Sequence, residues 1–176
     1  MKRLLVLAAA AGLAVAGVVT EERMGLLSVG DAAPQFSAVL STGQRISLSD
    51  YRGKRPLVLF FYPKDETAGC TAEVCSYRDS YGEIERLGAA LVGVSGDPPA
   101  SHERFIAHYN LPFPLIADTS RDLGRLYGTL RWGVPWLGTK RVTYVIDREG
   151  VIRGVFHHEL RIARHVERVI SLLAGL

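Results

Sequence analysis

The chain has 176 residues, of which 48% are hydrophobic and 22% are charged, a composition typical of one soluble globular domain. Its formal net charge is +3, but without Lys2 and Arg3 its 21 basic residues fall to 19, against 18 acidic ones. This balance is too even to indicate nucleic-acid binding, so we expect no nucleic-acid partner.

The first 23 residues have the features of a secretory signal peptide followed by a short linker. Two basic residues precede an uncharged, mostly apolar run over residues 4–19, which contains an Ala-Val-Ala pattern typical of a cleavage site. If residues 1–19 act as a signal, the domain from 24 to 176 is extracytoplasmic, either periplasmic or held by an uncleaved membrane anchor. If translation instead starts at Met24, the protein is cytoplasmic. We expect membrane contact only through this segment, and only if it is uncleaved.

The rest of the chain alternates between strand-like and helix-like patterns. Continuously apolar runs indicate strands buried on both faces, and apolar residues at helical spacing indicate helices between them. The order of these elements predicts an α/β protein with a mixed central sheet, helices on both faces and an N-terminal β-hairpin, as in the thioredoxin-like fold. In chain order we expect a hairpin (36–40 and 45–48), a strand (56–62), a helix (70–87), a strand (89–95), a helix (98–108), a strand (115–117), a helix (121–127), a hairpin (141–147 and 151–156) and a last helix from 162.

The two cysteines of the chain, Cys70 and Cys75, follow directly after the first buried strand. Cys70 falls at the expected start of a helix, where unpaired backbone N–H groups and the positive end of the dipole stabilise a thiolate. Thr67 can place its hydroxyl beside that sulfur. Pro63 ends the strand, and Gly69 permits close approach of the backbone. These features make Cys70 a candidate nucleophile.

The five-residue spacing of the cysteines indicates a switch more than a permanent cross-link. On an intact helix, residues five positions apart have Cα atoms about 8–9 Å apart, whereas a disulfide requires about 7 Å or less. A disulfide can therefore form only after the first turns unwind. A structural disulfide, common in exported proteins, would have to distort the helix. The spacing fits neither a zinc site nor the Cys-x-x-Cys of thioredoxin-type exchange, so we expect no bound metal.

The residues around Cys70 resemble the active site of the peroxiredoxins. The pattern Pro63-x-x-x-Thr67-x-x-Cys70 matches the signature of that family in residue types and in spacing. Cys75 is similar to the second thiol of the Q subfamily, also called bacterioferritin comigratory proteins. The resemblance extends over most of the chain, from about residue 26 to residue 174, and includes the segments 29–36 and 141–147.

The resemblance implies a thiol-dependent peroxidase that reduces hydrogen peroxide and organic hydroperoxides. Cys70 would attack the peroxide and become a sulfenic acid, and Cys75 would condense with it to an intramolecular disulfide. Thr67 would hydrogen-bond the peroxide and the thiolate, while Arg141 would stabilise the thiolate and orient the peroxide. Pro63 would shield the sulfur from bulk solvent. The substrate-binding residues that we expect are Pro63, Thr67, Gly69 and Arg141.

The same resemblance implies a reductant and an assembly. Thioredoxin would reduce the disulfide in a cytoplasmic protein, and a thioredoxin-like donor would do so for an exported one. No metal or organic cofactor is required. Because both thiols belong to one chain, a monomer can complete the cycle, and we expect a monomer.

Some features depart from the family pattern or leave alternatives open. Ala68 stands where the family often has proline, so we expect a more mobile loop. Trp132 and Trp136 fit a surface patch, a cover over the site or the core equally well. Two other functions stay open: an exported binding domain with a structural disulfide, and a peroxide sensor that passes its oxidation to a partner.

Overall fold

The computed structural model describes residues 25–131, 138–157 and 162–176. The segment 1–23, Met24, Trp132 and Trp136 lie outside the described residues, so the predictions for them stay predictions. Within the described ranges, no helix is long and apolar enough to cross a bilayer. The strands are β1 (Ser37–Val39), β2 (Arg45–Ser47), β3 (Leu57–Phe61), β4 (Ala90–Ser95), β5 (Leu115–Ala117), β6 (Val142–Ile146) and β7 (Ile152–His157). The helices are α1 (Ala68–Asp79), α2 (Tyr81–Arg86), α3 (Pro99–Tyr109), α4 (Asp122–Leu126) and α5 (Ile162–Leu173), with a single 3-10 turn at Leu48–Asp50.

Five strands form one mixed sheet in the order β5-β4-β3-β6-β7. β3, β4 and β5 run parallel, whereas β6 pairs antiparallel with β3 and β7 antiparallel with β6. β1 and β2 form the predicted N-terminal hairpin as a separate two-stranded sheet. In the central pair, Phe61 at the end of β3 lies opposite Val142 at the start of β6. This register brings the residues that follow β3 next to the residues that precede β6.

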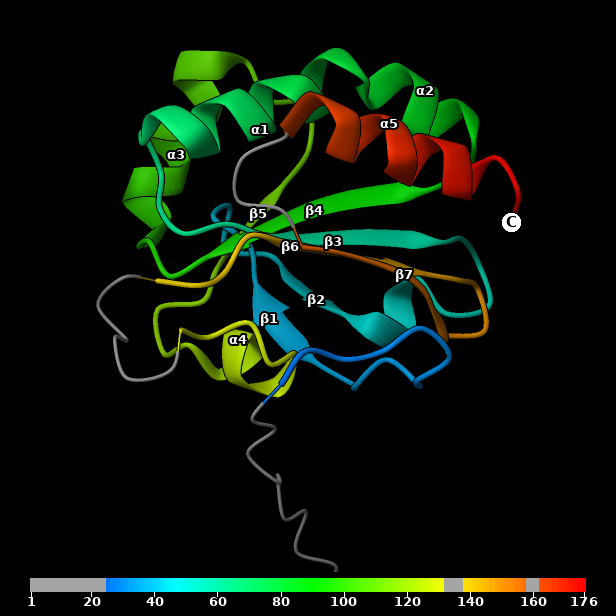
Figure 1. The fold of residues 1–176 in the computed structure, drawn as a ribbon. Coiled ribbons are helices and arrows are strands. Elements are labelled where there is room, and N and C mark those ends of the chain that lie inside the picture. Colours follow the sequence, from blue (N-terminus) through cyan, green and yellow to red (C-terminus); the bar gives the residue numbers. More distant parts are fainter. Residues whose placement is uncertain (1–24, 132–137, 158–161) are drawn as a thin grey trace, which may run out of the picture.

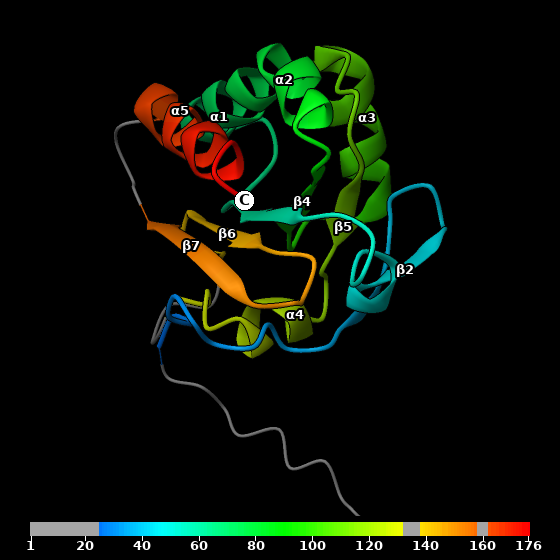
Figure 2. The same ribbon diagram turned by 90° about the vertical axis from the view of Figure 1, so that its right-hand side faces the viewer.

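The sheet lies between two layers, as Figures 1 and 2 show. One face carries α1, α2, α3 and α5, and the other carries α4 and the β1–β2 hairpin. Residues of β3 alternate between these faces: Leu57, Leu59 and Phe61 join one apolar cluster, while Val58 and Phe60 join the other. Every residue of this strand is buried, which explains its unbroken apolar sequence. The predicted α/β, thioredoxin-like arrangement with helices on both faces is confirmed.

The structure changes the boundaries of the cysteine-bearing helix. The helix predicted over 70–87 consists of two, because the backbone leaves helical geometry at Ser80, whose ψ is 1°. Ser80 ends α1 and its carbonyl accepts the first backbone bonds of α2, from Glu83 and Ile84. The apolar spacing continues across this break, so periodicity alone could not show it. α1 also begins two residues earlier than predicted, at Ala68.

Candidate active site

Cys70 lies in the first turn of α1, directly after β3 and its following loop. Thr67 is the N-cap, with extended backbone angles, and Ala68 is the first helical residue. The Cys70 side chain is buried, with the residue 1% exposed. The first turn of α1 carries no acidic residue, so no carboxylate there offsets the positive end of the helix. This agrees with the predicted position of the sulfur at a helix N-terminus.

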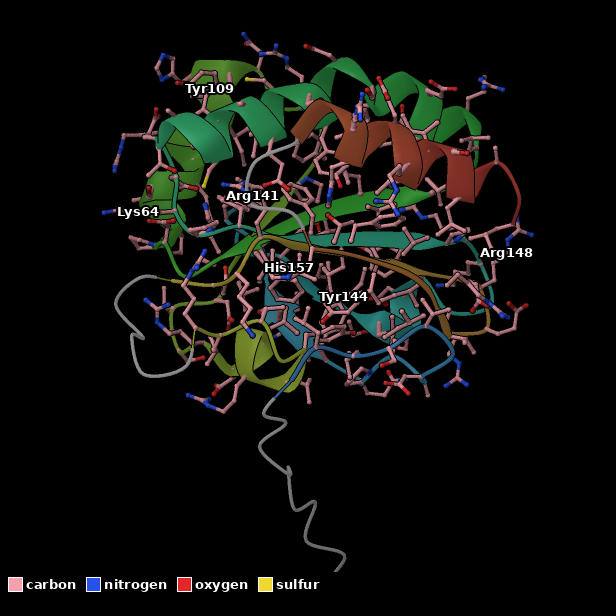
Figure 3. The ribbon with its side chains drawn as sticks, in the orientation of Figure 1. Lys64, Tyr109, Arg141, Tyr144, Arg148 and His157 are labelled. Carbon is pink, nitrogen blue, oxygen red and sulfur yellow. The ribbon has the colours of Figure 1, made fainter. Side chains whose placement is uncertain are left out.

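Arg141 reaches the sulfur from the other side. Its Nη2 donates a hydrogen bond to Sγ of Cys70 over 3.4 Å, although the two residues are 71 positions apart. Arg141 immediately precedes β6, and the antiparallel register of β3 and β6 brings it to the end of β3 where α1 begins. Figure 3 shows it on the side of the molecule where Lys64 lies, with Arg148 on the opposite side. The structure thus brings together two residues that only the family resemblance had linked.

Glu73 completes the charge arrangement and was not predicted from the sequence. Its carboxylate forms an ion pair with Nη1 of Arg141, and the two side chains are only 1% and 6% exposed. Burial alone would lower the pKa of Arg141, but the charges of Glu73 and Cys70 outweigh it and raise that pKa. The guanidinium therefore stays charged, and it is held between a carboxylate and the sulfur. Glu73 stands three residues after Cys70, one helical turn on, which is the signal that could have indicated it.

Gly69 has a geometric reason to be small. A Cβ atom at this position would lie 3.2 Å from Nη2 of Arg141, the nitrogen that bonds to Cys70. Any larger side chain would therefore push the guanidinium away from the sulfur or shift the first turn. The expected contribution of Gly69 to the site thus has a direct steric basis.

Pro63 and Thr67 lie in the loop between β3 and α1. Thr67 is exposed, and its hydroxyl donates to the backbone carbonyl of Lys64 over 3.1 Å. Pro63 is partly buried and packs against Gly138, where any Cβ atom would collide with the Pro63 carbonyl. Thr139 next to it donates its hydroxyl to the carbonyl of Tyr62 over 2.7 Å. The segment 138–141, immediately before β6, therefore holds the start of this loop, beside the arginine that contacts the sulfur.

Cys75 lies on the same helix, less buried than Cys70, and both thiols are free. α1 is continuous between them, so the predicted separation of about 8–9 Å between the Cα atoms applies. A disulfide between them requires part of α1 to unwind. Within the described ranges, no three histidine, cysteine or acidic side chains gather as one metal ion would require.

This arrangement suits a nucleophilic thiolate. The sulfur is shielded from water, belongs to the first turn of a helix and accepts a hydrogen bond from a permanently charged donor. The same donor can stabilise negative charge on an oxygen that leaves the reacting peroxide bond. A second thiol is available after a local change of conformation.

Comparison with known proteins agrees with this geometry. A profile described as "AhpC/TSA family" matches residues 29–155. The chain is 40% identical over 151 residues to "Peroxiredoxin Q, chloroplastic" of Populus jackii, covering 84% of this chain and 68% of that protein. It is 37% identical over 151 residues to "Putative peroxiredoxin bcp" of Coxiella burnetii, covering 84% of this chain and 99% of that protein.

Solved structures give the same result. Peroxidoxin BcpB from Mycobacterium tuberculosis superposes with a TM-score of 0.79 at 30% identity, over 84% of this chain and 97% of that one. Bacterioferritin comigratory protein from Xanthomonas campestris, studied for its alkyl peroxide reduction activity, has a TM-score of 0.75 at 29% identity, over 86% and 98%. The chain therefore belongs to the AhpC/TSA family and, within it, to the peroxiredoxins of the Q or bacterioferritin comigratory type, which are thiol-dependent peroxidases.

Proposed function

We propose that Cys70 is the peroxidatic cysteine of this peroxidase and that Cys75 resolves its oxidised form within the same chain. The observation that carries this proposal is the hydrogen bond from Arg141 to the Cys70 sulfur, which is buried in the first turn of α1. Arg141 is itself held by Glu73. A fixed positive charge at a shielded sulfur favours the thiolate, the reactive form of the thiol.

In the first step, the Cys70 thiolate attacks the terminal oxygen of a hydroperoxide. The S–O bond forms as the O–O bond breaks, and the leaving oxygen takes up a proton to give water or an alcohol. Cys70 is oxidised to a sulfenic acid. Arg141 and the first N–H groups of α1 are suited to stabilise charge on the leaving oxygen. Thr67 orients the peroxide, and Pro63 limits access of water to the sulfur.

In the second step, the thiol of Cys75 attacks the sulfenic sulfur, and a disulfide and water result. This step follows the unwinding of the first part of α1. A dithiol reductant of the thioredoxin type then reduces the disulfide and is itself oxidised. No metal or organic cofactor enters the cycle.

The substrates that we propose are hydrogen peroxide and organic hydroperoxides, supported by the alkyl peroxide reduction described for the Xanthomonas campestris relative. We propose that the protein acts as a monomer, which is sufficient for the cycle when both reacting thiols belong to one chain. Its location depends on residues 1–19: an export signal gives an extracytoplasmic enzyme, with a thioredoxin-like donor outside the cytoplasm. Initiation at Met24 gives a cytoplasmic enzyme that uses thioredoxin.

The test is oxidation of the reduced full-length chain by hydrogen peroxide, followed by stopped-flow fluorescence and intact mass. We expect fast loss of two thiols in the wild type and no fast reaction in Cys70→Ser. Cys75→Ser should stop at a sulfenic acid on Cys70. If the wild type reacts only as slowly as a free cysteine, the proposal is wrong. Turnover with a thioredoxin system separates an enzyme from a sensor, which would instead form mixed disulfides with a client.

A further inference from the structure

A buried ion pair lies beneath the loop that leads into α1, outside the proposed chemistry. Among the five loop residues Pro63–Thr67, all of which the structure describes, only Asp65 is buried. Its Oδ2 lies 2.9 Å from Nδ1 of His102 in α3, and the two side chains are 2% and 0% exposed. The hydroxyl of Tyr62 donates to the other oxygen, Oδ1, over 2.7 Å. Asp65 is thus where the loop is attached to the core.

Both ring nitrogens of His102 face acceptors. Nε2 lies 3.1 Å from the carbonyl oxygen of Ile116 in β5, which can only accept, so this nitrogen carries a proton. Burial alone would raise the pKa of Asp65, but the hydrogen bond and charge of His102 outweigh it and lower that pKa. Nδ1 faces Oδ2 of Asp65 over 2.9 Å. The other polar group facing the ring, the hydroxyl of Tyr62, lies at 3.5 Å from Nδ1.

The ring of His102 is therefore fixed at both nitrogens. A buried polar group is tolerated only when it is hydrogen-bonded, and Asp65 and Ile116 supply the partners of Nδ1 and Nε2. The carboxyl group of Asp65 likewise faces His102 and the hydroxyl of Tyr62. Removing either side chain would leave the other buried without that partner.

The backbone of Asp65 is fixed as well. Its N–H donates to Oδ2 of Asp97 over 2.9 Å, and the same oxygen accepts the hydroxyl of Ser95 at the end of β4 over 2.7 Å. Glu66, the next residue, has a φ of 59°, in the left-handed region that glutamate rarely adopts. Such a conformation persists only where the surroundings hold it. The contacts of Asp65 hold the loop immediately before Thr67, and so decide where α1 begins.

We propose that His102 and Asp65 form a buried positioning pair that holds the 63–67 loop, and with it the first turn of α1, in the conformation in which Cys70 reacts with peroxide. This inference rests on the proposed function of Cys70. Neither residue touches the peroxide, and both act through the backbone that carries the sulfur. A displacement of about 1 Å in a reacting group can slow a reaction about 100-fold, so a small movement of this loop is sufficient.

The first measurement is made on the reduced wild-type full chain and needs no stable variant. Long-range ¹H–¹⁵N NMR reports the hydrogen bonds of the His102 ring nitrogens, whose signals are assigned by their loss in His102→Gln or by sequential assignment. We expect the Nε2 proton to be held in the hydrogen bond to the Ile116 carbonyl and to exchange slowly with solvent. A His102 ring that exchanges its proton as fast as an exposed histidine would overturn the proposal.

The second measurement separates the two steps of the reaction by stopped-flow with hydrogen peroxide. In His102→Gln and Asp65→Asn, the rate constant of Cys70 oxidation should fall about 10–100-fold, while disulfide formation is not slowed. Glu66→Gln and His108→Gln are the matched controls, because this second acid–histidine pair joins the same loop to the same helix at the exposed surface, 3.3 Å apart. Exposed pairs contribute little, so the control rates should stay within about twofold of wild type.

The outcomes are distinguishable. If the wild type reacts as slowly as a free cysteine, the proposed function fails, whatever the state of His102. If the wild type reacts fast and the folded variants react equally fast, the positioning pair is wrong. Should either single variant unfold, the double variant Asp65→Asn/His102→Gln leaves no unpaired buried charge and should melt at a higher temperature than the singles. If that variant folds and oxidises Cys70 at the wild-type rate, the proposal also fails.

Discussion

The two ends of α1 are held by different interactions. The first turn, Ala68–Thr71, has an N-cap whose hydroxyl bonds to its own loop and makes no side-chain bond to the helix. It also contains Gly69, which weakens a helix by about 1 kcal/mol relative to alanine. In the last turn, the Tyr77 ring stacks on Phe60 with centroids 4.6 Å apart, and its hydroxyl lies 2.9 Å from Oγ1 of Thr143. The first turn has no capping side chain of its own and depends on the bond from Arg141 to Cys70. The last turn is held by the packing and the hydrogen bond of Tyr77.

This difference suits a helix that must open at one end only. Cys75 lies between the two ends, and in the proposed cycle it approaches Cys70 while the rest of the fold stays intact. Thr143 also bonds to Nε2 of His165 over 2.7 Å, so the Tyr77 contact joins α1 to both β6 and α5. We infer that unwinding stops before Tyr77.

Replacing Arg141 by alanine should have the largest effect, because it removes the charge that holds the first turn. Oxidation of Cys70 should slow by about 100–1,000-fold, as when a fixed donor is removed from a reacting centre. The buried carboxylate of Glu73 would lose its ion pair with Arg141, which lowers the free energy of unfolding by about 3–5 kcal/mol. Stopped-flow oxidation and urea unfolding measure these two effects.

The control for Arg141→Ala is Arg86→Ala, which removes an exposed ion pair with Glu83 on α2. We expect it to change neither the oxidation rate nor the stability measurably. A wild-type oxidation rate in folded Arg141→Ala would mean that the hydrogen bond to the sulfur has no role in the reaction.

The change Tyr77→Phe tests the last turn. It removes one buried hydrogen bond and should lower the free energy of unfolding by about 1–2 kcal/mol. The rate of disulfide formation should not change, because Tyr77 stays anchored in both the closed and the unwound states. Urea unfolding gives the first quantity and quenched-flow mass spectrometry the second. If disulfide formation instead accelerates in proportion to the lost stability, the whole of α1 unwinds, which contradicts this prediction. The control is Tyr81→Phe, which changes a tyrosine on α2 outside the unwinding helix.

The change Ala68→Pro tests the first turn. Proline fits the first helical position and restricts the unwound chain, which should stabilise the closed helix by about 0.4–1 kcal/mol. Disulfide formation should therefore slow about two- to fivefold, measured in the same quenched-flow experiment. Ala72→Gly, an exposed position within α1, weakens the helix by a similar amount and should have the opposite effect. Equal rates in both variants would contradict rate control by unwinding.

The smallest effect that we expect is on the free energy of unfolding at low pH. Burial would raise the pKa of Asp65, but His102 and Tyr62 lower it below its ordinary value of 3.8. The stabilisation from Asp65 is therefore complete above that value and is lost as the pH falls through the lower folded-state pKa. The stability difference between the wild type and Asp65→Asn should shrink as the pH falls below about pH 4. Urea unfolding at a series of pH values measures it.

Asp118 is the control for this acid effect. Its pKa is raised, with burial the largest cause, although the N–H groups of Leu123 and Gly124 bond to its carboxylate. Its stabilisation is therefore complete below 3.8 and is lost as the pH rises through the higher folded-state pKa. The wild type and Asp118→Asn should differ most at low pH, the reverse of Asp65. The same sign for both carboxylates would contradict these assignments.

The strands were the part of the fold that the sequence predicted best. β3, β4 and β6 are buried along their whole length. β3 is therefore an unbroken apolar run, and β4 and β6 are interrupted only by Ser95 and Thr143 as polar residues. The helix over 70–87 was predicted less well, because Tyr77 and Ile84 keep helical spacing on either side of the turn at Ser80. Periodicity follows which face is buried, and a change in a single ψ angle leaves that face unchanged.

The residues of the site also differ in how well the sequence predicted them. Pro63, Thr67, Gly69 and the two cysteines lie within one short segment, so spacing and helix geometry were sufficient to single them out. Arg141 was named only through the family resemblance, since nothing in its local sequence distinguishes it from other arginines. Glu73, Asp65 and His102 were missed, because charged residues are expected at the surface unless a partner is known. Their partners come from other elements of the fold.

The sequence by itself determined the strands, the position of Cys70 at a helix start and the need for unwinding before Cys75 can reach it. These follow from features of short segments: the apolar runs of the strands, the rise of a helix per residue and the free N–H groups of a first turn. Only the tertiary structure decided which charges surround the sulfur and its loop. Arg141 reaches Cys70 through the β3–β6 register, and His102 reaches Asp65 from α3. A charge can be buried only where the fold supplies its partner, and that supply depends on contacts between segments far apart along the chain.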